Sequence, residues 1–204
     1  MSLTELFGIL SGTVILFGGP PYLFDILKGK TKPQRTTWFI WTFLGSIAFT
    51  SQLKLGAHWS LVYVGLNVVG NLAVFLLSLK FGTGGWRKLD VLALFIACMG
   101  VTMSFLFTNP LMALSGSIVA DFAGSSLTLY KVYLDPSSET SITWFFIGTS
   151  SLFAALAVGK WDFSLLLYPA YICVATYGVL VAQWLGRFVR PHPSPSRIAH
   201  STTH

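Results

Sequence analysis

The sequence is poor in charged residues, and above all in acidic ones. Only 10% of its 204 residues are Asp, Glu, Lys or Arg, and seven of these are acidic. Soluble domains carry about 25% charged residues. The chain is instead 53% hydrophobic, with a mean hydropathy of +0.69. Such a composition excludes an ordinary water-facing surface and predicts an integral membrane protein.

The sequence also lacks the residue patterns of most enzymes and metal sites. Its two cysteines, Cys98 and Cys173, belong to separate hydrophobic segments and form no CxxC or Cys/His motif, so we expect free buried thiols. The four histidines all lie outside the hydrophobic segments, and the last segment has no lysine for a retinal Schiff base. We therefore expect neither an enzyme nor a bound metal or cofactor.

What the chain does contain is a series of long apolar segments. Each is about 20 residues long, which is enough to cross a bilayer core of about 30 Å. Backbone polar groups in lipid must be satisfied within the segment, so each is predicted to be a helix. The N-terminus has no basic region or cleavage site, and we expect the first segment to be retained. The seven predicted spans are 6–27, 36–55, 59–79, 89–107, 111–134, 140–159 and 162–185.

The net charge of +6 is distributed unevenly between the two sides of such a seven-span chain. One side holds only Lys54 and Lys160, and the other holds eleven cations. The side rich in Lys and Arg is cytoplasmic, which predicts an outside N-terminus, a cytoplasmic C-terminus and a place in the plasma (inner) membrane. The charge is a topology signal with membrane lipid as its partner, and no basic stripe interleaved with exposed aromatic residues indicates nucleic-acid binding. The eleven cations are Lys28, Lys30, Lys32, Arg35, Lys80, Arg87, Lys88, Lys131, Arg187, Arg190 and Arg197.

The same three-segment pattern occurs twice, with an approximate period of 104–106 residues. Ser11-Gly12 aligns with Ser115-Gly116, Thr37-Trp38-Phe39 aligns with Thr143-Trp144-Phe145, and Trp59 falls near Trp161. Three spans reverse the side of the chain, so the extra span 89–107 lets both copies run in the same direction. The predicted fold is all-α: two parallel three-helix bundles joined by a linker helix.

This repeat predicts the division of the chain. Residues 1–81 form the first three-helix repeat, 82–108 the linker with the fourth span, and 109–186 the second repeat. The proline-rich stretch 187–204 is predicted to be a disordered cytoplasmic tail. Dimerisation is not required to form a pore, because one chain already supplies both bundles.

Two motifs carry a family resemblance. The run from Pro21 to Thr31, with a proline in the inner half of the first span before a Lys-x-Lys-Thr loop, resembles the first-helix signature of the SWEET, SemiSWEET and PQ-loop transporters. Asn67-Val68-Val69-Gly70 resembles the Asn-x-x-Gly of the same families. The resemblance implies a 3+1+3 carrier in which Asn67 faces the substrate. The layout is also similar to that of nicotinamide riboside transporters.

The chain departs from this signature in both repeats. Ser125 stands at the position of Pro21, Tyr171 lies near the position where a second Asn is expected, and Tyr22 replaces the Gln of the family. For this reason the resemblance does not assign sugar as the solute.

Asp121 is the only acidic residue well inside a predicted span. A carboxylate at the bilayer centre costs roughly 2.5–3.5 kcal/mol on insertion scales. It must therefore face a polar interior or be protonated. We interpret it as a proton carrier or cation partner, and the alternative is a protonated Asp in an interhelical hydrogen bond.

Two amides and three tryptophans complete the inner face of the predicted site. Asn67 and Asn71 lie four residues apart, on one helix face, which we expect to point inward for solute binding or helix packing. Trp38, Trp41 and Trp144 lie near span ends, where Trp is usually part of the interfacial belt. The alternative is an aromatic clamp on the solute.

Two groups of residues complete the prediction. Tyr168, Pro169 and Thr176 are predicted to form the pocket wall of the second repeat. The run Gly18-Gly19-Pro20-Pro21 must weaken or kink the first helix, so Pro20, Pro21 and Tyr22, together with Trp41, are predicted gate or hinge residues. Asp25 is expected to pair with Lys28 or a loop cation, and Trp59 and Trp161 to be belt residues.

Together these features predict a facilitator or proton-coupled carrier for a small polar solute such as a sugar or vitamin. The solute site is predicted to comprise Trp38, Asn67, Asn71, Asp121, Trp144, Tyr168 and Thr176. The alternative is a non-transporting membrane receptor or scaffold of the PQ-loop type, which the missing second Asn favours.

Overall fold

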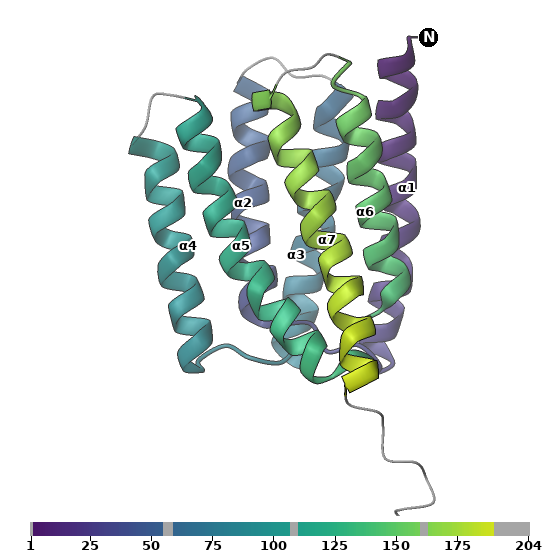
Figure 1. The fold of residues 1–204 in the computed structure, drawn as a ribbon, viewed down its shortest axis with the longest axis vertical. Helices are drawn as coiled ribbons and strands as arrows, with labels where there is room; N and C mark the ends of the chain where they lie inside the picture. The colour runs from purple at the N-terminus through teal and green to yellow at the C-terminus, as the bar shows by residue number, and fades with distance from the viewer. Residues whose placement is uncertain (1, 55–58, 107–109, 160–162, 190–204) are drawn as a thin grey trace, which may run out of the picture.

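The computed structural model describes residues 2–54, 59–106, 110–159 and 163–189. In these ranges the chain forms seven α-helices and one short 3-10 helix, with no β-strand (Figure 1). The predicted all-helical class is confirmed, and the helix ends differ from the predicted segments by a few residues. The elements are α1 (Leu3–Leu27), α2 (Arg35–Lys54), α3 (Trp59–Phe81), α4 (Lys88–Leu106), α5 (Pro110–Leu134), η1 (Pro136–Ser138), α6 (Ser141–Leu156) and α7 (Phe163–Val189).

The predicted start of the C-terminal tail was wrong. The tail was predicted to begin at Arg187, but α7 continues to Val189, because the helix keeps an apolar face through Phe188 beyond the predicted end of the span. The rest of the predicted tail, residues 190–204, lies outside the described residues.

Six of the helices form a closed ring. α1 packs against α3 and α6, α2 packs against α3 and α5, and α7 packs against α5 and α6. Exchanging α1, α2 and α3 for α5, α6 and α7 reproduces this set of contacts, and α1 and α5 run in the same direction (Figure 1). α4 lies outside the ring, mainly against α5 and with a smaller contact to α2. The ring is therefore pseudo-symmetric.

Two equivalent hydrogen bonds join the two halves of the ring. Thr37 Oγ1 on α2 donates to the carbonyl of Gly124 on α5 at 2.7 Å, and Thr143 Oγ1 on α6 donates to the carbonyl of Gly18 on α1 at 2.8 Å. Glycine lets each threonine approach the neighbouring backbone closely. The two donors are 106 residues apart in sequence, and so are the two acceptors. These bonds therefore define which positions of the two repeats are equivalent.

This register corrects one pairing made from the sequence. The alignment of Ser11 with Ser115 placed Ser125 at the position of Pro21, whereas the Thr–Gly contacts make Ser125 equivalent to Gly19. Two apolar segments can be aligned at several offsets with a similar match of residue types. The sequence therefore did not determine the alignment of α1 with α5.

α4 docks on α5 through small side chains. Ala93 and Ala97 on α4 are buried with Ala120 and Ala123 on α5 in one apolar cluster. A methyl group on Gly100 would collide with the backbone of α5. Close approach of small residues is how helices associate where no water drives them together.

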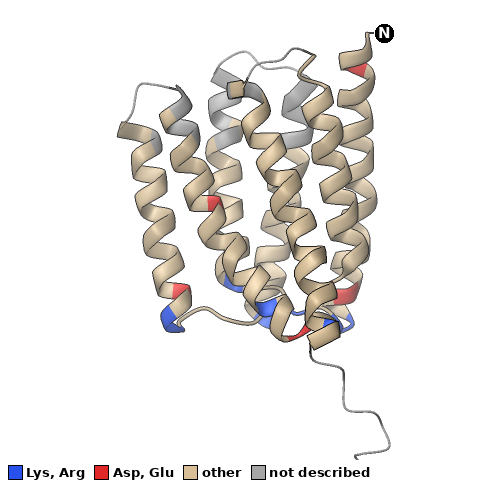
Figure 2. Cartoon of the chain, in the orientation of Figure 1, with Lys and Arg blue, Asp and Glu red and all other residues tan. Residues whose placement is uncertain are grey.

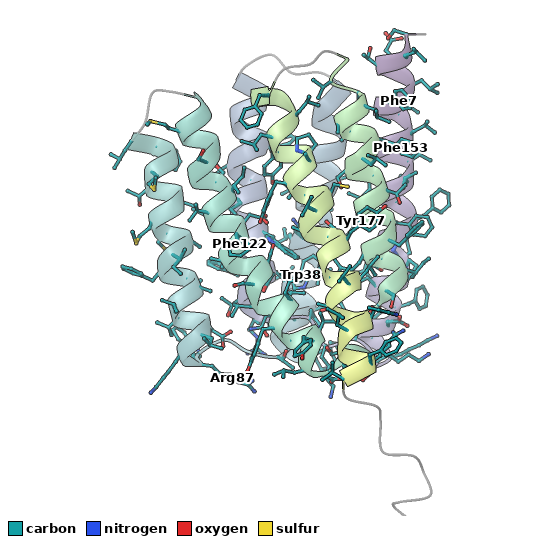
Figure 3. The ribbon with its side chains drawn as sticks, in the orientation of Figure 1. Phe7, Trp38, Arg87, Phe122, Phe153 and Tyr177 are labelled. Atoms are coloured by element: carbon teal, nitrogen blue, oxygen red, sulfur yellow. The ribbon has the colours of Figure 1, made fainter. Side chains whose placement is uncertain are left out.

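The distribution of side chains is inverted relative to a soluble bundle. Thr37, Ser78, Thr128 and Ser150 are fully buried, while large apolar side chains such as Phe122 cover the outside (Figure 3). Among the described residues, Leu3–Leu27 and Leu166–Val189 are long and apolar enough to cross a membrane, and Gly65–Phe81 and Ser141–Leu156 are shorter apolar helices.

The described Lys and Arg residues gather at one end of the bundle, called the charged end below (Figure 2). The connections α1–α2, α3–α4 and α5–α6 lie at this end. Arg35 donates to the carbonyls of Ser78 and Gly84 at 3.1 and 3.0 Å, which caps the C-terminus of α3. Asp90 accepts the side-chain amide of Gln34 at 2.5 Å and so ties α4 to the start of α2.

Candidate functional site

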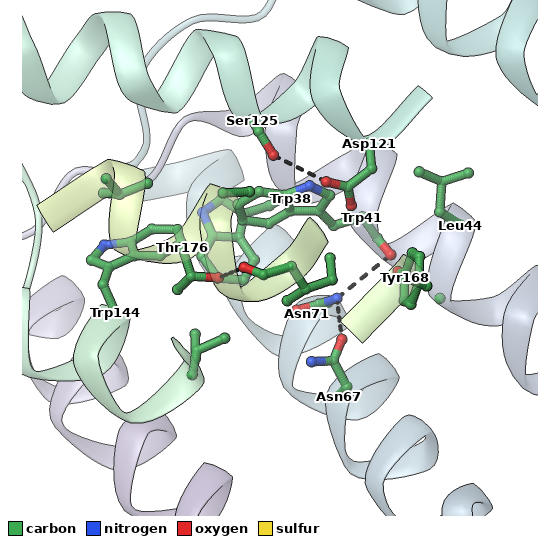
Figure 4. Close-up of a pocket in the computed structure, with 15 residues that line it drawn as sticks. Trp38, Trp41, Leu44, Asn67, Asn71, Asp121, Ser125, Trp144, Tyr168 and Thr176 are labelled. Carbon is green, nitrogen blue, oxygen red and sulfur yellow. Dashed lines mark hydrogen bonds between the residues drawn. The ribbon is translucent and has the colours of Figure 1, made fainter. Parts of the chain in front are cut away.

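A cavity of about 100 Å³ lies inside the ring, between the two halves. Its walls come from α2, α3, α5, α6 and α7. All seven residues predicted to bind solute line it, which brings together positions from both repeats (Figure 4). Their role in binding remains a prediction. The seven are Trp38, Asn67, Asn71, Asp121, Trp144, Tyr168 and Thr176.

The four predicted gate residues have different positions. Trp41 lines the cavity. Tyr22 is 1% exposed and packs against Trp38, with ring centroids 5.2 Å apart. Pro20 and Pro21 lie within α1, which continues through them to Leu27. These two prolines do not contribute to the cavity wall.

Asp121 is held inside the ring by two hydroxyl donors. Its carboxylate is 5% exposed and accepts hydrogen bonds from Tyr171 Oη on α7 at 2.8 Å and from Ser125 Oγ at 3.0 Å. Ser125 lies one turn further along α5. Both bonds end on the same oxygen, Oδ2, and the indole of Trp41 also lies beside the carboxylate.

The two amides of α3 form a pair. Asn71 Nδ2 donates to Asn67 Oδ1 at 2.8 Å and reaches the carbonyl of Trp41 at 3.5 Å (Figure 4). The predicted shared face of Asn67 and Asn71 is therefore confirmed, and it points toward α2 and the cavity. The pair places amide groups across the cavity from the carboxylate on α5.

Four aromatic rings, from Tyr22, Trp38, Trp41 and Trp144, form a layer that we call the aromatic floor. Ring centroids are 5.1 Å apart for Trp38 and Trp41, 5.8 Å for Trp41 and Trp144, and 6.4 Å for Trp38 and Trp144. The three indoles also line the cavity. The floor lies toward the charged end, because Trp38 and Trp144 belong to the first turns of α2 and α6.

The interfacial-belt interpretation was wrong for Trp38 and Trp144. They are only 4% and 3% exposed, because α2 and α6 turn these faces toward each other inside the ring. The side chain of Trp59 and the whole of Trp161, both predicted as belt residues, lie outside the described residues.

Three polar atoms of the aromatic floor are buried without a hydrogen-bond partner in the part of the chain that the structure describes. These atoms are Tyr22 Oη, Trp38 Nε1 and Trp41 Nε1. Trp144 differs, since its Nε1 donates to Glu139 Oε2 at 3.0 Å. In the 106-residue register the position of Glu139 is taken by Pro33, which offers Trp38 no acceptor.

A polar layer lies between the aromatic floor and the charged end. Glu139, which is 5% exposed, forms the one ion pair found among the described residues, with Lys131. Lys131 Nζ also donates to the carbonyl of Lys32 at 2.6 Å, which links the α1–α2 connection to α5. This layer therefore joins the two repeats beneath Trp144.

The expected partner of Asp25 was wrong. Asp25 Oδ2 accepts a hydrogen bond from Thr140 Oγ1 at 2.9 Å, and Thr140 also bonds to Thr31 at 2.5 Å. Lys28 instead lies over the ring of Phe24, 5.6 Å from its centroid. The α5–α6 connection folds beneath α1, and this tertiary contact replaces the local pairing expected from sequence neighbours.

Sequence reasoning missed part of the cavity wall. Ser125 lines it, and Tyr171 supports Asp121 from α7. Ser125 follows Asp121 by four residues, a helical spacing that could have identified it. Pro169, predicted beside Tyr168, does not contribute to the wall. The apolar part of the wall carried no sequence signal: Leu44, Gly45, Ile147, Ile172, Ala175 and Val179.

Comparisons with protein family models, with curated proteins and with solved structures found no match. The resemblance to SWEET and PQ-loop carriers therefore stays a prediction from the residues that carry it. What the chain does has to be inferred from the geometry of the ring and its cavity.

Proposed function

We propose that the chain is a seven-span membrane carrier, similar in layout to the SWEET and PQ-loop transporters, that moves a small polar solute by alternating access. One observation carries the proposal: a cavity whose mainly apolar wall contains a carboxylate, amides and hydroxyls lies where two pseudo-symmetric three-helix units meet. Substrate sites of secondary transporters lie at such repeat interfaces, near the middle of the membrane.

The surface of the bundle supports a position in the membrane. Its apolar side chains face outward and its polar side chains face inward, as expected for a protein surrounded by lipid. α1 has 25 residues, so it is roughly 37 Å long at 1.5 Å per residue, which exceeds a bilayer core of about 30 Å. α7, with 27 residues, is long enough as well, and the other five helices are proposed to span by packing in the same ring or beside it.

The charge distribution supports a topology. The charged end carries the described Lys and Arg side chains (Figure 2), and the cytoplasmic side of a membrane protein is the side rich in these residues. We therefore assign the charged end to the cytoplasm and the N-terminus to the outside. In this orientation the aromatic floor separates the cavity from the cytoplasm.

The aromatic floor has the properties of a gate. A buried polar group without a partner costs about 1–3 kcal/mol, and the floor contains three such groups. Opening the floor would give each group a water partner at the expense of aromatic and apolar contacts. These opposing contributions bring the closed and open states closer in free energy, which alternating access requires.

The cavity volume limits the solute. One water needs roughly 10–15 Å³ of such space, so a cavity of about 100 Å³ admits a solute of roughly seven to ten heavy atoms. Its carboxylate, amides and hydroxyls provide hydrogen bonds, and its indoles provide flat apolar faces. This combination is suited to a small solute with both polar and apolar parts.

Asp121 is the group proposed to couple transport to protons. A buried carboxyl group that binds either a proton or a solute can link the two. The titratable groups beside it are Tyr168 and Tyr171 on α7. α2 presents Trp41, which does not titrate, and α4 contributes nothing to the cavity wall.

Uptake into proteoliposomes by the full chain, with a panel of sugars, amino acids and vitamins, tests the proposal. We expect at least one solute to be taken up, with reduced flux for Asn67→Ala and Asp121→Asn. Trp86→Phe is the matched control, because Trp86 is 89% exposed and far from the wall of the cavity. Unchanged flux in both site variants contradicts the site. Absence of any uptake, with a soluble protein co-purifying, favours the receptor or scaffold alternative.

A further inference from the structure

The charge that faces the cavity has one sign. Asp121 is the only acidic residue in the wall, and no Lys, Arg or His side chain belongs to the described wall. Lys131, the described cation that forms an ion pair, bonds to Glu139 and to the carbonyl of Lys32 below the aromatic floor. An ionised Asp121 would therefore have hydroxyl donors but no protein cation to balance its charge.

The same cavity is rich in aromatic side chains. Three indoles enclose its floor at interplanar angles of 82° for Trp38 with Trp41 and 66° for Trp41 with Trp144. Indoles set at steep angles present their faces and edges to one enclosed volume rather than stacking into a flat layer. The face of an indole attracts a cation through its quadrupole, more strongly than any other side-chain ring does.

From this juxtaposition of one carboxylate and three indoles, we infer that the solute is a small organic cation, with Asp121 as its counter-ion and Trp38, Trp41 and Trp144 as its aromatic contacts. The inference rests on the proposed carrier function and names its substrate class. A metal cation such as Na⁺ would need several oxygen ligands around it, whereas most of this wall is indole and aliphatic carbon. An organic cation with apolar substituents satisfies both parts of the wall.

The other polar groups indicate what else the cation carries. Asn67 and Asn71 lie across the cavity from Asp121, and Thr176 belongs to the wall of α7 (Figure 4). Amides can donate to and accept from a hydroxyl or carbonyl group. The structure therefore suits an amphipathic cation whose positive end lies between the indoles and Asp121 and whose neutral polar end reaches the amides.

Calorimetric titration of the purified full chain in detergent micelles tests this inference without requiring transport. The probes are choline and N-methylpyridinium, each compared with its uncharged carbon isostere: the tert-butyl analogue of choline, and toluene. We expect each cation to bind about tenfold or more tightly than its isostere, because only the cation gains the counter-ion and the indole faces. Equal binding of cation and isostere, or binding of neither cation, overturns the inference.

Matched variants assign the binding to this cavity. Asp121→Asn is expected to weaken choline binding about tenfold or more, and Asp135→Asn, which changes an exposed carboxylate at the charged end, to leave it unchanged. Trp41→Leu should weaken binding while Trp41→Phe restores most of it, which separates an aromatic contact from a folding defect. Unchanged binding in Asp121→Asn overturns the inference.

The binding and transport experiments distinguish a wrong cation inference from a wrong carrier function. If neutral solutes enter proteoliposomes and cations neither bind nor move, the carrier function stands and the cation inference is wrong. If choline binds through Asp121 and no solute crosses the membrane, the cation site stands and the carrier function is wrong.

Discussion

Trp38 and Trp144 occupy equivalent positions in the two repeats and meet each other, with ring centroids 6.4 Å apart. Residues that contact their own pseudo-symmetry mates lie on the axis that relates the two halves. The axis therefore passes through the aromatic floor, directly beside the cavity.

The two threonine–glycine bonds are predicted to stabilise the contact between the two halves. Thr37→Val removes the bond to the Gly124 carbonyl and also the bond that Thr37 Oγ1 accepts from Thr128 Oγ1 at 3.2 Å, whereas Thr143→Val removes the bond to the Gly18 carbonyl. Each should lower the free energy of unfolding by about 0.5–1.5 kcal/mol. Thermal unfolding in detergent measures the effect. Thr102→Val is the control, because Thr102 bonds only within α4, and an equally large loss there would contradict the interpretation.

Two glycines are predicted to respond to the same change with opposite signs. Alanine at Gly100 collides with the backbone of Gly116 and Ala120 on α5, whereas alanine at Gly70 meets nothing within 4 Å. Gly100→Ala should destabilise by about 1–3 kcal/mol through overpacking. Gly70→Ala should stabilise by about 0.5–1 kcal/mol, because glycine loses more backbone entropy in a helix. A stabilised Gly100→Ala protein would show that α4 does not dock on α5 as described.

The ion pair beneath Trp144 is predicted to keep the aromatic floor closed. Glu139→Gln removes the charge that pairs with Lys131 while leaving an oxygen for the Trp144 indole. Hydrogen bonds to charged groups contribute about 1.5–3 kcal/mol, so the open population should rise about tenfold.

Thiol labelling measures this opening. In a background with Cys98→Ala and Cys173→Ala, a membrane-impermeant reagent added at the charged end should modify Ala175→Cys about tenfold faster once Glu139→Gln is present. The reference variant is Asp135→Asn. An unchanged labelling rate would mean that the floor is not held by this ion pair.

Proton coupling is predicted to depend on one residue. In proteoliposomes, a pH gradient should change the flux of the transported solute in the unmodified chain, and Asp121→Asn should abolish that response. Asn cannot bind or release a proton, yet it keeps an oxygen for Tyr171 and Ser125 to contact. A response that survives in Asp121→Asn removes coupling through this residue, and Asp135→Asn should respond as the unmodified chain does.

The positions of the helices followed from the sequence because each helix coincides with a long apolar segment. Among the cavity residues, Asp121, Asn67 and Asn71 were predictable for a related reason. A polar side chain in an apolar segment is costly on the lipid side, so it must face the interior of the ring. The helix positions and the inward-facing polar residues can each be predicted from a single segment, without knowledge of how the segments pack.

Features that depend on packing between segments were not predictable. The direction of Trp38 and Trp144 is set by how α2 and α6 face each other, and Trp is compatible with either a belt or an interior. The contact of Asp25 with Thr140 depends on a loop 115 residues away in sequence. The apolar wall of the cavity has the same composition as the lipid-facing surface, so its residues carried no signal.

The central claim is that the cavity opens alternately to the two sides of the membrane. The most direct measurement is the labelling of Ala175→Cys by membrane-impermeant thiol reagents applied separately to each face, in the background without the two native cysteines. Ala175 is in the cavity wall, and cysteine adds a thiol there at little change in volume. A carrier predicts modification from both faces, with protection by any solute that is transported. Modification from one face only, or from neither, would contradict alternating access.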